Sequence, residues 1–199
     1  MTDPKTNSIL DEGNRLFLQG NFEQAINYYD KILDDDPKHV SSLNNKGYAL
    51  SKLKDFTNAI KCYDAALKIS PNDLSVLINK ISSFRKQGNL VEALMICDNI
   101  LRNNKNYNIV LYHKERILFS MKKFDESISC CNSILEDYPN NGDVLFDKAS
   151  NFAMLSNFDD ALNLLEHAIS QGIQYKIKAK KSKSFENLSN NTRFQNLIS

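Results

Sequence analysis

The sequence is poor in the residues from which catalytic and ligand-binding loops are usually built. Its 199 residues include no tryptophan, six glycines, four prolines, four cysteines and three histidines. So few glycines leave little from which to build a phosphate-cradling loop, and no Gly-rich phosphate motif, HExxH or GxSxG motif occurs. The cysteines lack CxxC spacing and the histidines His39, His113 and His167 stand apart, which argues against a metal site. We therefore expect no catalytic residue, no cofactor and no metal, and a protein that is not an enzyme.

The chain also lacks a long apolar run and an excess of charge of either sign. No stretch approaches the ~20 apolar residues that span a bilayer, and the first residues lack the apolar segment of a signal peptide. The formal net charge is +1, so no global field attracts nucleic acid or an anionic membrane. These absences predict a cytoplasmic protein with no membrane contact, and they argue against nucleic acid as its main partner. The four cysteines fit reduced thiols in that compartment.

What the sequence does contain is one pattern that occurs five times at a spacing of 34 residues. In each copy a turn signal precedes a bulky apolar residue, and a small residue follows three positions later. The bulky residues are Phe22, Phe56, Leu90, Phe124 and Phe158, and the small ones are Ala25, Ala59, Ala93, Ser127 and Ala161. A fixed period of this length is typical of helical solenoids, in which each repeat buries its apolar face against its neighbours.

Each copy of the pattern predicts two helices joined by a short turn, because apolar residues recur at helical spacing on both sides of it. We expect first helices near 6–19, 39–53, 73–87, 107–121 and 141–155, and second helices near 22–35, 56–69, 90–103, 124–137 and 158–171. An Asn or Asp just before a second helix can cap its free N–H groups, and a glycine in the turn can adopt a left-handed conformation. Gly13 and Gly47 are expected to face Ala25 and Ala59, which would let the two backbones approach closely.

The second copy carries the clearest match to a known family. Its residues Leu43, Gly47, Leu50, Ala59, Tyr63, Ala66 and Pro71 resemble the tetratricopeptide repeat pattern. The resemblance implies an all-α fold, a right-handed α-solenoid (superhelix) of antiparallel helix pairs. It divides the chain into five repeats at 6–39, 40–73, 74–107, 108–141 and 142–173, followed by a C-terminal capping helix and tail over 174–199. The apolar residues of that last segment are expected to fold back onto the solenoid.

In the resembling family the first helices line a concave groove that holds a partner protein. The outward positions of these helices hold the candidate peptide-groove residues Asn14, Asn45, Tyr48, Lys52, Asn79, Arg85, Lys86, Tyr112, His113, Arg116 and Phe146. The asparagines could bind a peptide backbone, or they could only satisfy neighbouring helices. The aromatic residues offer apolar contacts, and the Lys and Arg residues make this face locally basic. The expected partner is therefore another protein, which presents an extended or helical peptide segment with apolar anchors and some acidic residues.

Two features leave alternatives open. Glu115 occupies a position that is small or apolar in the other copies, and it either bonds locally near Ser127 or reaches the groove and contacts a ligand. A lysine cluster in the C-terminal segment either solvates the cap or binds RNA or an acidic partner. These lysines are Lys176, Lys178, Lys180, Lys181 and Lys183.

The sequence as a whole predicts a non-catalytic scaffold or adaptor that binds a peptide segment of a partner in the groove. The alternative is a protein that associates with RNA or an acidic partner through its lysine-rich cap. Self-association is left open, and the identity of the partner is not encoded in any motif found in the chain.

Overall fold

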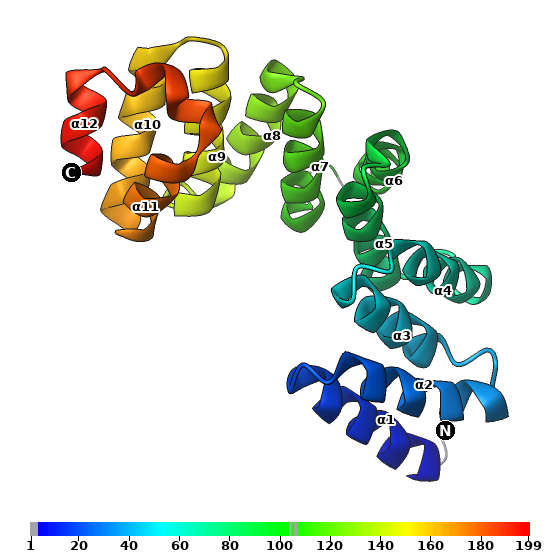
Figure 1. Cartoon of the computed structure of the whole chain (residues 1–199). Coiled ribbons are helices and arrows are strands. Elements are labelled where there is room, and N and C mark those ends of the chain that lie inside the picture. The colour runs from blue at the N-terminus through cyan, green and yellow to red at the C-terminus, as the bar shows by residue number, and fades with distance from the viewer. Residues whose placement is uncertain (1–3, 104, 106) are drawn as a thin grey trace. The chain divides into compact units, whose positions relative to one another are not determined.

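A computed structural model describes residues 4–103, 105 and 107–199, and these residues form helices and no strand (Figure 1). The paired helices are α1 (Pro4–Leu18), α2 (Phe22–Asp35), α3 (Val40–Lys52), α4 (Phe56–Ile69), α5 (Leu74–Gln87), α6 (Leu90–Asn103), α7 (Asn108–Ser120), α8 (Phe124–Asp137), α9 (Gly142–Met154) and α10 (Phe158–Gln171). Each begins and ends within two residues of its predicted position, so the helix predictions are confirmed. Among the described residues, no helix combines the length and the apolar character needed to cross a bilayer.

The chain divides into two compact units, residues 1–96 and residues 97–199, named unit 1 and unit 2 below. In unit 1, α1 packs on α2 and α3 on α4, while α2 packs on α3 and α4 on α5. In unit 2, α7 packs on α8, α8 on α9 and α9 on α10. Successive helices thus pack in antiparallel pairs within each unit, which is the predicted α-solenoid arrangement. Each repeat buries its apolar face against its neighbours.

Ion pairs with the same 34-residue period connect consecutive repeats. In each pair a lysine of a first helix contacts an aspartate of the preceding second helix. The pairs are Lys46 Nζ–Asp30 Oδ1 at 2.5 Å, Lys80 Nζ–Asp64 Oδ1 at 2.6 Å and Lys114 Nζ–Asp98 Oδ1 at 2.7 Å. The first two lie in unit 1 and the third in unit 2. These aspartates are therefore engaged by lysines at the stacking contacts.

The close approach of the two helices predicted at Gly13 and Gly47 is present. The nearest atoms to these glycines belong to tyrosines and not to Ala25 and Ala59. A Cβ added to Gly47 would lie 2.6 Å from Tyr63 Cε1, and one added to Gly13 would lie 2.8 Å from Tyr29 Cε1. The glycines therefore lie against tyrosine rings, and the alanines are not the nearest groups. Tyr29 and Tyr63 are almost fully buried, so these rings fill the interior of the first two helix pairs.

The predicted caps of the second helices form only in part. The Asp55 carboxylate accepts a hydrogen bond from the Asn58 backbone N–H at 3.2 Å, whereas the side chains of Asn21 and Asn157 make no such bond. The capping prediction is therefore wrong at these two asparagines.

All five turns inside the helix pairs share a left-handed residue. The backbone angle φ is 81° at Gly20, 65° at Lys54, 94° at Gly88, 60° at Lys122 and 62° at Ser156. These positions are 34 residues apart, and only two are glycines. A residue with a Cβ pays about 1–2 kcal/mol in this region, so the packing of the helix pair imposes the turn whatever residue stands there.

This strain predicts opposite effects for two exchanges. Gly88→Ala should lower the free energy of unfolding by about 1 kcal/mol, because nothing lies within 4 Å of an added Cβ and only the positive φ opposes it. Lys54→Gly should raise the same free energy by about 0.5 kcal/mol, since relief of strain exceeds the added entropy of the unfolded chain. Urea denaturation followed by circular dichroism measures both changes. Shifts of the same sign would contradict the assignment.

The C-terminal segment packs on the last helix pair of unit 2. It forms α11 (Gln174–Lys181), the 3-10 helix η1 (Lys183–Leu188) and α12 (Thr192–Ile198). Here η1 contacts α9, while α11 and α12 contact α10. The buried side chains of the segment are Tyr175, Ala179, Phe185, Leu188 and Phe194, with Leu197 and Ile198 packed against them. The segment is thus part of the core of unit 2.

Candidate functional site

Three of the predicted groove residues line one cavity in unit 1. This cavity has a volume of about 300 Å³ and is lined by Asn14, Phe17, Leu18, Tyr29, Asn45 and Tyr48. These side chains come from α1, α2 and α3, which pack on one another. We call this feature the amide cavity, because two asparagine side chains meet in it.

The two asparagines of the amide cavity have fixed orientations. Tyr29 donates its hydroxyl hydrogen to Asn14 Oδ1 at 3.0 Å, and Asn45 Nδ2 donates to the same oxygen at 2.9 Å. Burial raises the pKa of Tyr29 to about 12, so its hydroxyl keeps the proton that it donates. Asn14 Nδ2 and Asn45 Oδ1 have no partner among the described residues. The asparagine side chains that line the cavity therefore offer one donor and one acceptor, and a peptide group can pair with both kinds of group.

The wall of the amide cavity is aromatic and its rim is apolar. The rings of Phe17 and Tyr48 stack with centroids 4.9 Å apart and an angle of 29° between their planes. Leu18 is 84% exposed and Tyr48 is 38% exposed, although both side chains are largely apolar. Lys52 Nζ lies 5.1 Å from the centroid of the Tyr48 ring. An apolar side chain of a ligand would contact these rings and Leu18, and its removal from water would favour binding.

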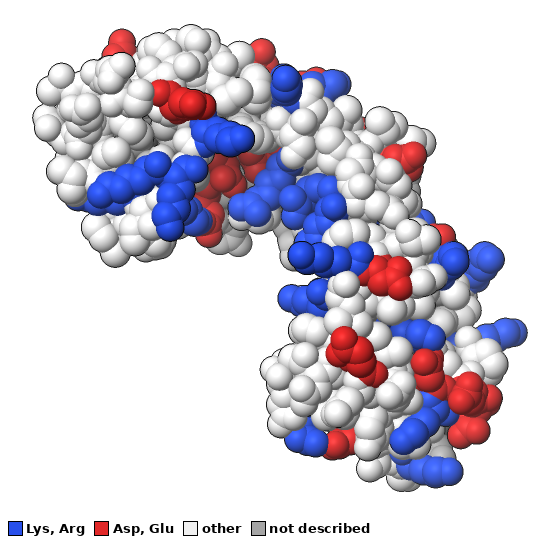
Figure 2. All heavy atoms as spheres, viewed as in Figure 1, with Lys and Arg blue, Asp and Glu red and all other residues white. Residues whose placement is uncertain are grey.

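Cations gather next to the amide cavity. Lys52 ends α3, and Arg85 and Lys86 lie in the last turn of α5, a helix that contacts α3. Burial, together with the nearby charges of Lys52 and Arg85, lowers the pKa of Lys86. Figure 2 shows Lys and Arg side chains grouped over this part of unit 1. The predicted basic face is therefore a local cluster of like charges.

Asn79 does not join the amide cavity. Its Nδ2 donates a hydrogen bond to Asn44 Oδ1 at 3.0 Å, so it connects α5 to α3. For Asn79 this bond favours the interpretation in which an asparagine satisfies a neighbouring helix. Asn45 differs because it bonds to Asn14 through its Nδ2 and, among the described residues, its Oδ1 has no hydrogen-bond partner.

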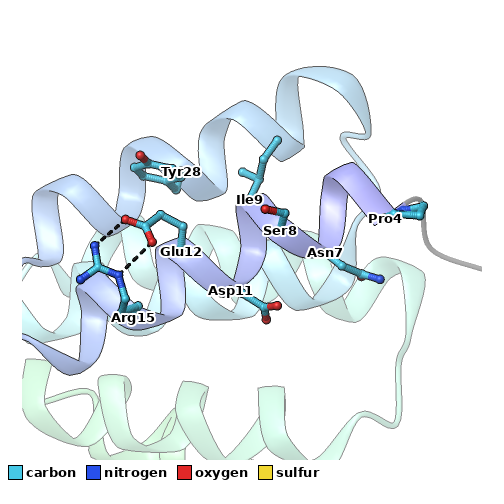
Figure 3. Close-up of a pocket in the computed structure, with 8 residues that line it drawn as sticks. All are labelled: Pro4, Asn7, Ser8, Ile9, Asp11, Glu12, Arg15 and Tyr28. Atoms are coloured by element: carbon cyan, nitrogen blue, oxygen red, sulfur yellow. Dashed lines mark hydrogen bonds and ion pairs between the residues drawn. The ribbon is translucent and has the colours of Figure 1, made fainter.

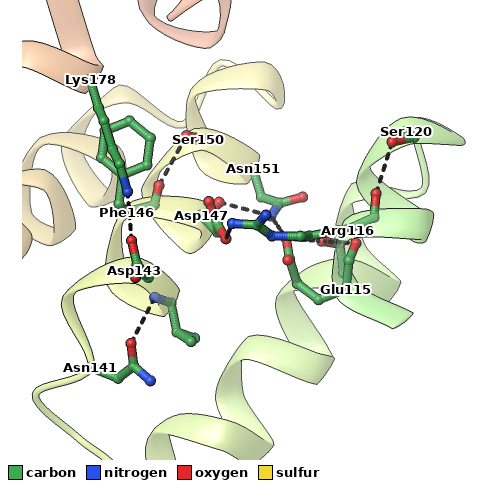
Figure 4. Close-up of polar contacts among 12 residues, drawn as sticks. Glu115, Arg116, Ser120, Asn141, Asp143, Phe146, Asp147, Ser150, Asn151 and Lys178 are labelled. Atoms are coloured by element: carbon green, nitrogen blue, oxygen red, sulfur yellow. Dashed lines mark hydrogen bonds and ion pairs between the residues drawn. The ribbon is translucent and has the colours of Figure 1, made fainter. Parts of the chain in front are cut away.

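Arg116, a predicted groove residue of unit 2, contacts other side chains of that unit (Figure 4). Arg116 Cζ lies 4.4 Å from the centroid of the Tyr112 ring, and Arg116 Nη2 lies 3.4 Å from Asp147 Oδ2. His113 is half-buried on the same helix, α7. The charge of Arg116 is therefore partly neutralised inside unit 2.

Phe146 does not line an open groove, contrary to the sequence prediction. It is 8% exposed, and its ring centroid lies 6.0 Å from that of Tyr175 and 5.6 Å from that of Phe185. Lys178, which pairs with Asp143 at 2.6 Å, lies over the same ring. The C-terminal segment thus covers Phe146, because α9 is the last first helix and its apolar face needs a cover.

Glu115 is a structural residue in this arrangement. It is 2% exposed, and Ser127 donates its hydroxyl hydrogen to Glu115 Oε1 at 3.1 Å. Asn151 Nδ2 lies 3.5 Å from the same oxygen. Burial and then the charge of Asp147 raise the pKa of Glu115 to about 7. These contacts favour the local hydrogen bond over the ligand contact, and Figure 4 shows Glu115 among the side chains of α7 and α9.

Two other cavities are lined in part by charged residues. One, of about 740 Å³, lies on α1 and α2, and its Arg15 donates two hydrogen bonds to Glu12, at 2.8 and 2.6 Å (Figure 3). The other, of about 300 Å³, is lined in part by Lys180, Lys181 and Lys183. The remaining lysines of the C-terminal cluster are engaged: Lys176 bonds the Ser199 carbonyl at 3.1 Å, and Lys178 pairs with Asp143.

The cysteines show no sign of chemical activation. Burial raises the pKa of Cys97 to about 12 and that of Cys130 to about 11, and it raises the pKa of Cys131 as well. These side chains are thiols at neutral pH, and a thiol is a poor nucleophile. Within the part of the chain that the structure describes, no group of three or more His, Cys, Asp or Glu side chains could hold a metal ion.

Sequence reasoning missed Phe17, Leu18 and Tyr29 as site residues. Phe17 lies three residues after Asn14 and therefore on the same side of α1, a spacing from which it could have been found. The hydroxyl of Tyr29 gave no signal in the sequence, because its contact with Asn14 depends on how α2 packs on α1.

The chain is similar to known proteins in part of its sequence and in its fold. The family model described as tetratricopeptide repeat matches residues 10–73. None of the curated proteins compared with the sequence matches it. Among solved structures, YrrB, a tetratricopeptide repeat protein with an unusual peptide-binding site, aligns with a TM-score of 0.69 at 20% identity over 87% of this chain and 91% of its own. MamA from Desulfovibrio magneticus RS-1 aligns with a TM-score of 0.78 at 15% identity, covering 92% of this chain and all of its own.

Proposed function

Because this chain is a tetratricopeptide repeat protein, we propose that it is a non-catalytic scaffold that holds a peptide segment of a partner protein against unit 1. The observation that carries the proposal is the amide cavity. It combines an oriented donor and acceptor with an aromatic wall, and both kinds of group suit a peptide. YrrB, which has the same fold, is described as a protein with a peptide-binding site, and this supports the proposal.

The peptide would be held by its backbone and by one apolar side chain. Its C=O would accept from Asn14 Nδ2 and its N–H would donate to Asn45 Oδ1. The apolar side chain would lie between the Phe17–Tyr48 stack and Leu18. Acidic residues of the peptide would face the cations of α3 and α5. Because their charges and rings are engaged within unit 2, Tyr112, Arg116 and Phe146 are left out of the proposed site.

The test is selection of ligands followed by exchange of Tyr48. Random dodecapeptides displayed on phage are selected on the immobilised full chain, and the affinity of a selected peptide is measured by isothermal titration calorimetry. Tyr48→Ala should weaken binding by about 30-fold, since aromatic residues at the centre of an interface often contribute about 2 kcal/mol. Melting should change little, because Tyr48 is 38% exposed.

Tyr138→Ala is the matched control, because Tyr138 is also exposed, belongs to unit 2 and is not among the residues that line the cavity. It should leave the affinity within twofold of the parent. If selection yields no peptide, or if the two tyrosine variants bind equally well, the amide cavity is not a peptide site.

The alternative partner, RNA or an acidic protein at the C-terminal lysines, predicts a different result. Exchange of Lys180, Lys181 and Lys183 for Gln would then abolish capture, and binding would disappear between low and physiological salt. Capture that survives physiological salt and the loss of these lysines excludes this alternative.

A further inference from the structure

One repeat position in the last turn of the first helices changes from apolar to basic along unit 1. It holds Leu18 on α1, Lys52 on α3 and Lys86 on α5, at the 34-residue spacing of the repeat. Leu18 lines the amide cavity, and Lys52 lies over Tyr48, which lines it too. Since α1 contacts α3 and α3 contacts α5, the apolar position and the two lysines follow one another along adjacent helices.

The two lysines lack the ion pairs that similar residues make elsewhere in the unit. Asp30 and Asp64 are bound to Lys46 and Lys80 at the stacking contacts. Within the described residues, neither Lys52 nor Lys86 forms an ion pair with a carboxylate. Partial burial of the ammonium group, and then the nearby charges of Lys52 and Arg85, lower the pKa of Lys86. An anion placed between the two lysines would relieve the repulsion between their charges.

A role at the helix ends does not by itself account for these lysines. Cations stabilise the C-terminal ends of helices, where the backbone carbonyls carry partial negative charge. The same position holds Ser120 on α7 and Met154 on α9, so two further first helices end without a cation there. At this repeat position, lysine therefore occurs on α3 and α5 and on none of the other first helices.

We propose, on the basis of the function proposed above, that unit 1 binds two side chains of the peptide, which are three residues apart in the peptide sequence. An apolar side chain enters the amide cavity between α1 and α3, and an acidic side chain pairs with Lys52 and Lys86 at α3 and α5. Packed helices lie about 8–10 Å apart, so the two points are one helix spacing from each other. In a polyproline II conformation, residues i and i+3 lie on the same side and about 9 Å apart. The ligand is therefore an acidic peptide segment in that conformation.

The experiment uses the full chain and the phage-displayed dodecapeptides. Selected sequences should share an apolar and an acidic residue with two residues between them. For a synthetic copy of one such peptide, the double variant Lys52→Gln/Lys86→Gln should bind about tenfold more weakly at physiological salt. Shifting the acidic residue by one position in the peptide should cause a similar loss with the parent protein. The matched control is Lys61→Gln/Lys68→Gln, which removes the same charge from α4 and should bind within twofold of the parent.

Each outcome decides between the two proposals. Binding at two points is contradicted if the peptides lose affinity with Tyr48→Ala but bind both lysine double variants equally. It is also contradicted if the selected peptides show no fixed spacing between the apolar and the acidic residue. Either result leaves the proposed peptide site in the amide cavity intact. Failure to select any peptide overturns both. Circular dichroism should give the same helicity for all variants, because the exchanged lysines are exposed.

Discussion

Replacing Phe185 with alanine is expected to destabilise unit 2 by about 3–5 kcal/mol, the cost of deleting a fully buried aromatic ring. Phe185 is 1% exposed, and its ring lies 5.6 Å from that of Phe146 and 5.8 Å from that of Phe194. The exchange removes the centre of this aromatic cluster and leaves a cavity over α9. Phe146 would then become accessible on a surface that the segment now covers.

The effect of Phe185→Ala is best measured by amide hydrogen exchange, because it reports the free energy of opening of each unit separately. Protection should fall in α9–α12 and remain unchanged in α1–α4. Ile177→Ala is the control, since Ile177 is 54% exposed on α11 and its truncation should cost less than about 0.5 kcal/mol. Equal effects of the two exchanges would mean that the segment is not part of the core.

Replacing Glu115 with glutamine is expected to stabilise unit 2 at pH 8 by about 3 kcal/mol. The pKa of this carboxyl rises from its ordinary value of 4.5 to about 7 in the folded protein. Its contribution to stability is therefore complete below pH 4.5 and is lost as the pH rises to about 7. Glutamine keeps the size and polarity of the protonated acid without the charge, so the variant escapes this loss.

The measurement is the difference in stability between the parent protein and the Glu115→Gln variant as a function of pH. Thermal unfolding of parent and variant should coincide near pH 4.5 and diverge up to pH 8. The groups that face Glu115 are Ser127 on α8, Asp147 and Asn151 on α9, and Arg116 on its own helix. Glu136→Gln, at an exposed position on α8, makes the same chemical change and should show no such divergence. A parent that gains stability relative to the glutamine variant as the pH rises would refute the raised pKa.

The comparison of Asn45 with Asn79 explains why the helices could be predicted and the site only in part. Both occupy the same position in consecutive repeats, and their local sequence signals are equivalent. Asn45 meets Asn14 and Tyr29 in a cavity, whereas Asn79 is bound to Asn44 on the adjacent helix. Which partner an asparagine finds depends on residues more than thirty positions away. No local pattern contains that information.

The burial of Phe146 also depends on residues that are distant in the sequence. As an outward residue of a first helix, it would be exposed wherever a groove is open. The segment after α10 instead folds over α9, and Tyr175 and Phe185 bury the ring. The exposure predicted from its position in the repeat was therefore wrong, because the repeat ends with the last helix pair and the following segment covers this ring.

The sequence alone determined the repeat, its 34-residue period and the positions of ten helices, because these depend on contacts between residues close in the chain. Only the tertiary structure decided which outward residues meet in the amide cavity, and that the charge of Arg116 is engaged by Asp147. Only the tertiary structure placed Glu115 in the interior beside Ser127. These outcomes depend on packing between helices, where distance in space is unrelated to distance along the chain.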